Sequence, residues 1–215
     1  YLISESLNEA VTDPSQWLDK SFFKVKGIAT IEKIGPEEAD NWKLERSELA
    51  GPFTLVDAAP EEKLDTSKAS AIGSAFSNAQ FEDVYVGDEI AANPTEHTKF
   101  IIETFDGFTY TVGLGEENDD VLPLTVSLAG SVNQTREAGE DESEEDKKKL
   151  DDEFAKEALK LREKLMTEAS YAGKTFKIRS FVVDSILKTR AELLAKEEEE
   201  NAAEKEIPGL NLPGN

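Results

Sequence analysis

The fold of this chain depends on the stretch Lys99-Phe-Ile-Ile-Glu-Thr-Phe-Asp-Gly-Phe-Thr-Tyr-Thr-Val-Gly-Leu114, where two strand-like runs flank one Asp-Gly pair. Asp-Gly suits a two-residue type I′ turn, because both central residues of that turn have positive φ. A turn at Asp106-Gly107 sets Phe105 opposite Phe108. The register gives the ribbon one strongly apolar face, formed by Ile101, Phe105, Phe108, Tyr110, Val112 and Leu114. The opposite face carries Phe100, Ile102, Thr104, Thr109 and Thr111. A ribbon with one apolar face must bury it against helices or a second sheet.

Composition limits the classes of protein that this chain can belong to. Its 215 residues suffice for one generous domain or two small ones. The formal net charge of −22 argues against binding to nucleic acid or to an anionic lipid surface. The absence of Cys excludes disulfides, thiolate nucleophiles, zinc fingers and iron–sulfur clusters. A single histidine, His97, excludes a paired-histidine metal site and disfavours a histidine-based catalytic triad.

The sequence contains no membrane-spanning or targeting segment. No apolar run approaches the roughly 20 residues that span a bilayer, and there is no signal peptide. The chain begins at Tyr1 rather than Met, in a segment that already resembles a strand. We therefore interpret it as a fragment or processed form, and an anchor could have preceded it.

Before the central ribbon, the pattern predicts a helix, three strands, a second helix and a fourth strand. The first helix begins at Asp13-Pro14 and ends at Gly27, with Trp17, Leu18, Phe22 and Val25 on its apolar side. Strands over 28–34, 42–46 and 53–56 favour an antiparallel meander. The second helix spans 65–79, with Asp65 or Thr66 as its cap and Ala69, Ile72 and Phe76 facing inward. The fourth strand spans 81–86.

After the ribbon, a strand is predicted over 122–128, with Leu124, Val126 and Leu128 on one face. A polar linker or turn over 136–152 leads into a long charged amphipathic helix over about 144–170, with Leu150, Phe154, Ala158, Leu161 and Leu165 on its apolar stripe. A strand over 175–179 precedes a final helix that Ser180 caps, with Phe181, Val183, Ile186, Leu187, Ala191 and Leu194 on its apolar side. Residues 201–215 are predicted to be a disordered tail.

These elements predict an α+β fold of antiparallel sheets, in a meander and hairpins, flanked by helices. We predict a single domain over 1–200. A division into two lobes, at about 1–96 and 97–200, is the alternative.

An ordered set of short motifs resembles the bacterial family DUF4340, a domain of unknown function. The motifs are Asp13-Pro-Ser-Gln-Trp-Leu-Asp-Lys20, Trp42-Lys-Leu-Glu-Arg46, Phe53-Thr-Leu55, Lys63-Leu-Asp-Thr-Ser-Lys68, Phe81-Glu-Asp-Val84, Phe105-Asp-Gly-Phe-Thr-Tyr-Thr-Val-Gly-Leu-Gly115 and Phe181-Val-Val-Asp-Ser-Ile-Leu-Lys-Thr-Arg190. Together they cover about 1–195. The resemblance implies an α+β domain that follows one N-terminal membrane helix, lies outside the cytoplasm, and is accessory to ABC-type or gliding-motility-associated transport. This chain lacks that helix, and the family brings no catalytic residues to transfer.

One acidic loop could bind a hard cation. Glu116, Glu117, Asp119 and Asp120, with Asn118 between them, offer the oxygen ligands that Ca²⁺ takes. Their spacing is not that of an EF-hand loop, and a solvated hairpin loop explains the same residues equally well. No metal site is therefore predicted, and these four acids are kept as calcium candidates.

Other reactive residue types lack a catalytic pattern. Asp83, Glu103 and Asp106 could act as acid–base carboxylates only if a cleft separated their pKa values. Ser74 and Ser131 each follow a glycine but lack the Gly-x-Ser-x-Gly elbow. Gly113 and Gly115 lack the third glycine of a dinucleotide fingerprint, and a hairpin end explains them. His97 is expected in a solvent-facing loop.

The aromatic residues and the long helix could each form a binding surface. The rings that could line a groove are Trp17, Phe22, Phe23, Trp42 and Phe53, but such rings usually belong to the core. The apolar stripe of the long helix could dock a partner, although packing on its own sheet is the expected use.

We therefore predict a non-catalytic, extracytoplasmic interaction or scaffold domain of a membrane-anchored envelope protein, without a cofactor, whose partners are envelope or transporter proteins. Two alternatives remain. One is a binding module for a small envelope ligand such as a saccharide or peptide, which an aromatic-lined pocket would favour. The other is a carboxylate-dependent hydrolase, which a cleft with one strongly raised carboxyl pKa would favour.

Overall fold

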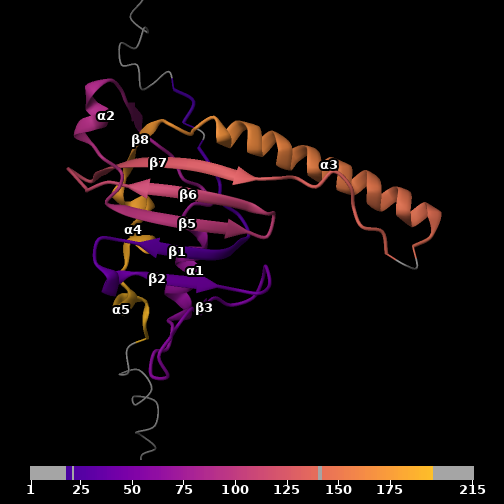
Figure 1. The fold of residues 1–215 in the computed structure, drawn as a ribbon, viewed down its shortest axis with the longest axis horizontal. Helices are drawn as coiled ribbons and strands as arrows, with labels where there is room; N and C mark the ends of the chain where they lie inside the picture. The colour runs from indigo at the N-terminus through magenta and orange to yellow at the C-terminus, as the bar shows by residue number, and fades with distance from the viewer. Residues whose placement is uncertain (1–17, 21, 140–141, 196–215) are drawn as a thin grey trace, which may run out of the picture.

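A single antiparallel sheet of eight strands organises the described chain (Figure 1). The computed structural model describes residues 18–20, 22–139 and 142–195. The strands are β1 (Ile28–Ile34), β2 (Trp42–Glu45), β3 (Thr54–Leu55), β4 (Asp83–Tyr85), β5 (Thr98–Thr104), β6 (Phe108–Leu114), β7 (Val121–Gly130) and β8 (Thr175–Arg179). Their order across the sheet is β3-β2-β1-β5-β6-β7-β8-β4. The predicted α+β class and antiparallel arrangement are confirmed.

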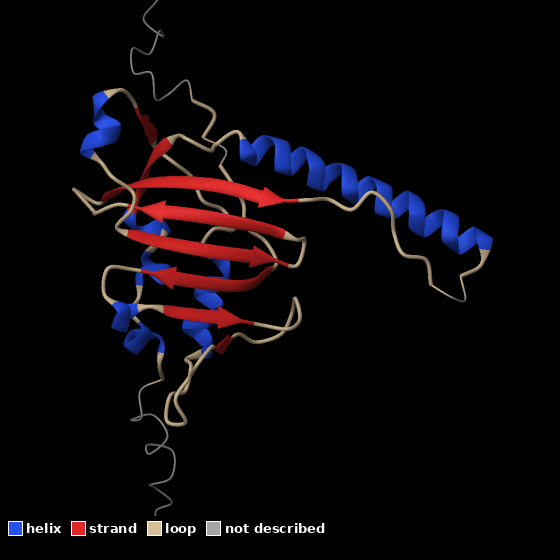
Figure 2. Cartoon of the chain, viewed as in Figure 1, coloured by secondary structure: helices blue, strands red, loops and turns tan. Residues whose placement is uncertain are grey.

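The described chain has five α-helices. They are α1 (Thr66–Ser74), α2 (Asp88–Ala92), α3 (Glu144–Ala169), α4 (Asp184–Leu187) and α5 (Arg190–Leu193), with 3-10 turns η3 (Glu38–Asp40) and η4 (Ser180–Val182). In Figure 2, α1, α4 and α5 lie behind the sheet, whereas no described helix crosses its front face. The short α2 stands at one corner, and α3 runs outward beyond β7. The two faces of the sheet therefore have different environments.

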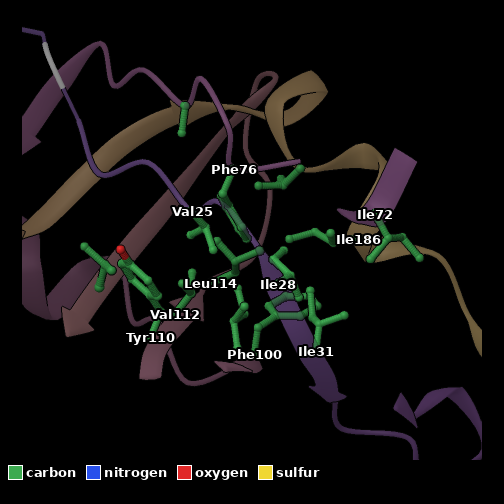
Figure 3. Packing of buried hydrophobic residues seen from close by; sticks show 14 of the residues in the cluster. Val25, Ile28, Ile31, Ile72, Phe76, Phe100, Tyr110, Val112, Leu114 and Ile186 are labelled. Atoms are coloured by element: carbon green, nitrogen blue, oxygen red, sulfur yellow. The ribbon is translucent and has the colours of Figure 1, made fainter. Parts of the chain in front are cut away.

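The core lies between the sheet and the helices behind it (Figure 3). Alternate residues of β5, β6 and β7 face inward, as one face of a half-buried antiparallel sheet requires. Their side chains are buried at Phe100, Ile102, Phe108, Tyr110, Val112, Leu114, Leu122, Leu124 and Val126. Behind them Ala69, Ile72 and Phe76 form the predicted inward stripe of α1, and Asp65 caps α1 by accepting from the amides of Ser67 and Lys68. These side chains join the sheet and helix into one apolar cluster.

Both halves of the sequence contribute to the one sheet. β1, β2 and β3 form the predicted meander, and β1 also pairs with β5. At the other edge β4, from the first half, pairs with β8, from the second. A boundary near residue 96 therefore does not separate two sheets.

The predicted register of the central hairpin is wrong by one residue. Ile102 pairs with Tyr110 and Phe100 with Val112, so the loop is Phe105-Asp106-Gly107 and has three residues. Only Gly107 has positive φ (79°), as in a three-residue loop that ends in a glycine bulge. A one-residue shift moves every side chain of a strand to the other face. Phe100 and Ile102 are consequently buried, whereas Phe105 is 42% exposed in the turn.

The helix predicted to end at Gly27 is absent over its described part. Residues 22–26 have no regular structure, and residues 13–17 lie outside the described chain. Phe22, Phe23 and Val25 are all buried. The segment instead crosses the core in an extended path, with the Val25 amide donating to the Phe76 carbonyl at 3.0 Å.

The final helix is broken into η4, α4 and α5, which corrects the continuous helix predicted from residue 180. Lys33 Nζ donates hydrogen bonds to the carbonyls of Leu187 and Lys188, and Trp42 Nε1 donates to the same Lys188 carbonyl. These contacts hold Lys188 in an extended conformation (ψ 143°). Thr189 then starts α5 with a capping box. One consequence is that Phe181, expected inside, is 73% exposed.

The long charged helix forms as predicted, from Glu144 to Ala169. Its last turns are fixed by Glu168, which is 7% exposed and accepts hydrogen bonds from the Tyr110 hydroxyl (2.7 Å) and the Lys24 amide (3.1 Å). Its first turns are tied to the preceding segment by Arg136, whose guanidinium binds the carboxylates of Glu142 and Asp151. Residues 144–153 are all exposed. The predicted disordered tail, 201–215, lies outside the described residues.

Candidate functional site

An apolar hollow of about 620 Å³ opens beside the edge strand β4. We call it the β4 hollow. It lies between β4, α2, the start of β8 and the loop after α3. Its lining consists of Leu18, Asp19, Phe81, Val84, Tyr85, Val86, Gly87, Ile90, Tyr171, Gly173, Lys174 and Phe176. Its volume is in the range of ligand-binding pockets.

Aromatic rings form the inner wall of the β4 hollow. The rings of Phe81 and Phe176 lie 5.1 Å apart in an edge-to-face arrangement, and Tyr171 meets Phe176 at 5.8 Å and 89°. Behind them, the buried ring of Phe22 contacts Phe81, Tyr171 and Phe176. Such edge-to-face contacts stabilise a ring pair by more than the burial of its apolar area alone does. The wall is therefore a preformed apolar surface.

The rim of the hollow exposes aliphatic side chains from two separate segments. Val86 is 65% exposed, Ile90 is 43% exposed and Leu18 is 37% exposed. Gly87, between Val86 and α2, has a positive φ of 56°, which turns the chain sharply at the rim. Single exposed aliphatic residues are ordinary, but a group of them around a hollow is typical of a binding surface.

A small charged cluster borders the hollow on the β4 side. Lys177 Nζ lies 4.7 Å from the centre of the Tyr85 ring and 3.7 and 3.8 Å from carboxylate oxygens of Asp83 and Glu89. Burial raises the pKa of Tyr85, so its hydroxyl stays protonated at neutral pH. The ion pairs of Lys177 with Asp83 and Glu89 hold its ammonium group against the Tyr85 ring. Chemically, the hollow can accept apolar groups and one or two hydrogen bonds.

The structure separates the four calcium candidates into two places. Glu116 and Glu117 lie at the start of the β6–β7 loop, whereas Asp119 and Asp120 form its two-residue tip. Both tip residues have positive φ (51° and 62°), so the type I′ turn expected in the central hairpin occurs here. Among the described residues, no three acidic or histidine side chains gather as metal ligands would. The four acids stay calcium candidates without support from this geometry.

The three candidate carboxylates do not converge. Asp83 lies on the edge strand β4 and accepts a hydrogen bond from the Val84 amide. Glu103 lies on the open face of β5, where it accepts from the Thr30 hydroxyl at 2.9 Å. Asp106 lies in the β5–β6 turn. The pKa is lowered at the carboxyl groups of Glu62, Asp65, Glu142 and Glu192, which lie outside this set of three.

The remaining small residues have local structural roles. The Ser74 hydroxyl donates to helix carbonyls within α1, and Ser131 is exposed just after β7. The segment before β5 passes close to the backbone at Gly113 and Gly115. A Cβ at Gly113 would lie 2.7 Å from the Thr95 carbonyl oxygen, and a Cβ at Gly115 would lie 2.1 Å from the Pro94 carbonyl oxygen. Close approach of two backbones explains both glycines.

His97 is exposed, as predicted, with its Nδ1 atom 3.7 Å from a Glu116 carboxylate oxygen. It borders a hollow of about 370 Å³ that Lys33 and Asp40 also line. Burial lowers the pKa of Lys33, but its amine is held by the carbonyls at the end of α4. Lys33 thus acts as a cap for α4 in this arrangement.

The aromatic groove is not formed by the residues suggested from the sequence. Phe22, Phe23 and Trp42 are buried in the core, as the alternative interpretation held. Phe53 is half-buried elsewhere, against the Arg46 guanidinium. Trp17 lies outside the described residues. The hollow instead uses Tyr85, Val86, Ile90 and Tyr171, which the sequence analysis did not single out. The sequence signal that could have indicated the hollow is an apolar residue, Val86, directly before the turn-forming pair Gly87-Asp88.

Comparison with protein-family models, with curated proteins and with solved structures gave no match. The resemblance to DUF4340 accordingly stays a prediction. Within the described residues, no helix is both long enough and apolar enough to cross a bilayer.

Proposed function

We propose that this chain is a non-catalytic binding domain that holds a partner protein at the β4 hollow. The observation that carries the proposal is the joining of an aromatic-walled hollow of about 620 Å³ to a rim of exposed aliphatic side chains. Interfaces commonly centre on one apolar anchor side chain in a pocket, surrounded by a rim that excludes water. The partner is expected to insert such an anchor against the rings of Phe81, Tyr171 and Phe176.

The rim favours a protein over a small molecule. Small ligands are usually enclosed and oriented by several convergent polar groups. The β4 hollow is open, and among the described residues its charged lining side chains are those of Asp19 and Lys174. Val86 and Ile90 line the rim of the hollow with exposed apolar surface, which a protein would cover more fully than a small ligand would.

A small apolar ligand is the second candidate, because the wall of the hollow is aromatic. An apolar molecule with one hydrogen-bonding group would match its lining. The hydrolase alternative lacks an observation of this kind: the pKa values of Glu62, Asp65, Glu142 and Glu192 are all lowered, whereas a general acid would need a raised one.

The cellular setting is proposed from the resemblance to DUF4340. We propose an extracytoplasmic domain of a membrane-anchored envelope protein, accessory to an ABC-type transport system, whose partners are envelope or transporter proteins. The ordered motifs over about 1–195 support this setting. Protease accessibility of the anchored protein in intact cells and in spheroplasts tests its side of the membrane.

Site-specific photocrosslinking tests the binding function directly. A photoreactive phenylalanine at Val86 places the crosslinker on the rim of the hollow. The same residue at Met166, which is 78% exposed on α3, is the matched control. In cells that carry the anchored protein, we expect discrete crosslinked products from position 86 and none of the same size from position 166.

A second variant checks that the products depend on the hollow. Ile90→Glu places a charge on the rim without removing a buried side chain, and should abolish the crosslinks from position 86. Leu159→Glu, an equivalent change at an exposed residue of α3, should leave them unchanged. Equal products from both crosslinker positions, or products insensitive to Ile90→Glu, would overturn the proposal.

A further inference from the structure

A second hollow, of about 430 Å³, lies toward the opposite edge of the sheet from β4. Its lining combines one arginine with the end of α1 and the loop before β3. The lining residues are Arg46, Ala50, Gly51, Pro52, Phe53, Ser70, Gly73 and Ser74. It contains a cation and two hydroxyl groups but no carboxylate.

Arg46 differs from the other arginines of the described chain. Arg136, Arg179 and Arg190 each bind a carboxylate, at distances up to 3.0 Å. Arg162 is exposed on α3. Arg46 is partly buried, yet its polar side-chain contact is a single hydrogen bond from Nε to the Ile28 carbonyl at 2.6 Å. Its two terminal nitrogens therefore have no acceptor among the described residues.

Aromatic rings hold the Arg46 guanidinium in place. Its central carbon lies 4.6 Å from the centre of the Phe53 ring and 5.8 Å from that of the Phe105 ring. Phe53 is fixed in turn by Gly73, where a Cβ would come within 2.7 Å of the ring. Rigid stacking of this kind presets the planar fork of an arginine for a bidentate ligand.

Arg46 carries its positive charge at this hollow without a carboxylate partner among the described residues. Burial lowers the pKa of Arg46, which means that desolvation of its charge is not offset by a partner. A partly buried charge without a counter-ion is unfavourable, and a bound oxyanion would relieve that cost. The hydroxyls of Ser70 and Ser74 donate to helix carbonyls, so their free lone pairs can accept from a hydroxyl on the ligand.

We propose that Arg46, Ser70 and Ser74 form a binding site for a small oxyanion, either a carboxylate or a phosphate. The guanidinium fork binds two oxygens of the anion, and the serines accept from any neighbouring hydroxyl group. The site is separate from the β4 hollow and does not depend on the partner proposed there.

Calorimetric titration with inorganic phosphate, and separately with acetate, tests the proposal at constant ionic strength set with chloride. We expect saturable binding of at least one probe. Arg46→Gln should weaken it by about tenfold or more, as expected for loss of a charged hydrogen-bonding partner. Arg162→Gln removes the same charge from an exposed helix and should leave the affinity unchanged.

The outcomes separate the sources of the anion. Saturation by phosphate alone assigns a phosphate site, by acetate alone a carboxylate site, and by both a general oxyanion site. If Arg46→Gln fails to fold, Ser74→Asp introduces a carboxylate into the lining and should abolish binding, whereas Ser74→Asn should retain it. Absence of saturation with both probes, or equal weakening by the Arg46 and Arg162 changes, overturns the proposal.

Discussion

At the scale of single residues, the pair Tyr110–Glu168 is the most demanding contact in the described chain. The Tyr110 ring is fully buried and its hydroxyl meets the carboxylate of Glu168, a residue that is 7% exposed. A buried carboxylate is tolerated only when donors surround it. Burial and this carboxylate together raise the pKa of Tyr110, which keeps the hydroxyl a donor. The contact ties the end of α3 to the centre of the sheet.

Tyr110→Phe should therefore destabilise the fold. The change removes one donor and leaves Glu168 with the Lys24 amide, at 3.1 Å, as its nearest remaining donor. We expect the free energy of unfolding to fall by about 1–3 kcal/mol, the usual cost of leaving a buried polar group without its partner. Urea denaturation measures the change. Tyr85→Phe is the control: it should change the free energy by less than about 0.5 kcal/mol, as surface substitutions do. Equal effects of the two changes would contradict this account.

A second residue-scale prediction concerns acid. Hydrogen bonds from the Arg190 guanidinium, at 3.0 and 2.7 Å, and from the Ala59 amide hold the pKa of Glu62 at about 2, against an ordinary value of 4.5. Because the folded-state pKa is lowered, this contribution to stability is complete above about pH 4.5 and is lost as the pH falls toward 2.

Thermal unfolding between pH 5 and pH 2 tests this prediction. Glu62→Gln should lower the melting temperature at pH 5 and make its dependence on pH shallower across the window. Glu163→Gln, at an exposed position of α3, should leave the shape of the curve unchanged. A Glu62→Gln curve parallel to the wild-type curve would contradict the assignment.

At the scale of elements, the clearest conformational strain of the backbone lies in the turn between β6 and β7. Asp119 and Asp120 both have left-handed conformations, which non-glycine residues adopt at a cost. The double change Asp119→Asn and Asp120→Gly introduces the Asn-Gly pair that type I′ turns prefer. We expect stabilisation by about 1 kcal/mol in urea denaturation. Asp106→Gly, at a turn position with ordinary φ, should not stabilise the protein. A neutral or negative effect of the double change would contradict the assignment of strain.

The central hairpin shows how far sequence can go at this scale. The alternation of apolar and polar residues located both strands and the turn. Ile101 and Ile102, however, are adjacent and equally apolar, so the predicted register buries Ile101 and the observed register buries Ile102. The choice was made by packing: Phe100 and Ile102 meet the core, and Phe100 lies near Trp42. A three-residue loop then leaves Phe105 outside. The local preference of Asp-Gly for a two-residue turn carries no information on the distant contact between Phe100 and Trp42.

The broken C-terminal helix gives a similar lesson. The apolar spacing from residue 181 to residue 194 fits one helix, and nothing nearby in the sequence interrupts it. The interruption comes from Lys33 and Trp42, about which the local sequence carries no information. By contrast, the apolar periodicity of α3 lies within its own sequence, directly after the capping residue Ser143. The bounds of α3 were therefore predicted to within about one residue. The candidate site was missed because its lining comes from several separate segments.

At the scale of the whole molecule, α3 has an uneven attachment. Its last turns reach the core through Glu168, whereas residues 144–153 are exposed and depend on Arg136. Local opening requires little free energy where few side chains are buried. Amide hydrogen exchange should therefore be fastest in the first three turns of α3 and slowest in β5 and β6.

Arg136→Gln tests this uneven attachment. The change should speed exchange in the first turns of α3 without altering β5 and β6, because the contacts it removes are to Glu137, Glu142 and Asp151, none of which lies in the sheet. Arg162→Gln should leave the pattern unchanged. Uniform exchange along α3 in the unmodified protein would show that the helix is stabilised along its whole length.

The strand order also has a consequence for how the protein is made. β1 pairs with β5, and β4 must wait for β8, which is the last of the described strands to leave the ribosome. The nascent amino-terminal half therefore cannot complete its sheet during synthesis, and pairing across such long loops is intrinsically slow. We expect productive assembly only after the final strand emerges, with the unfinished apolar surface of the early strands relying on chaperones until then.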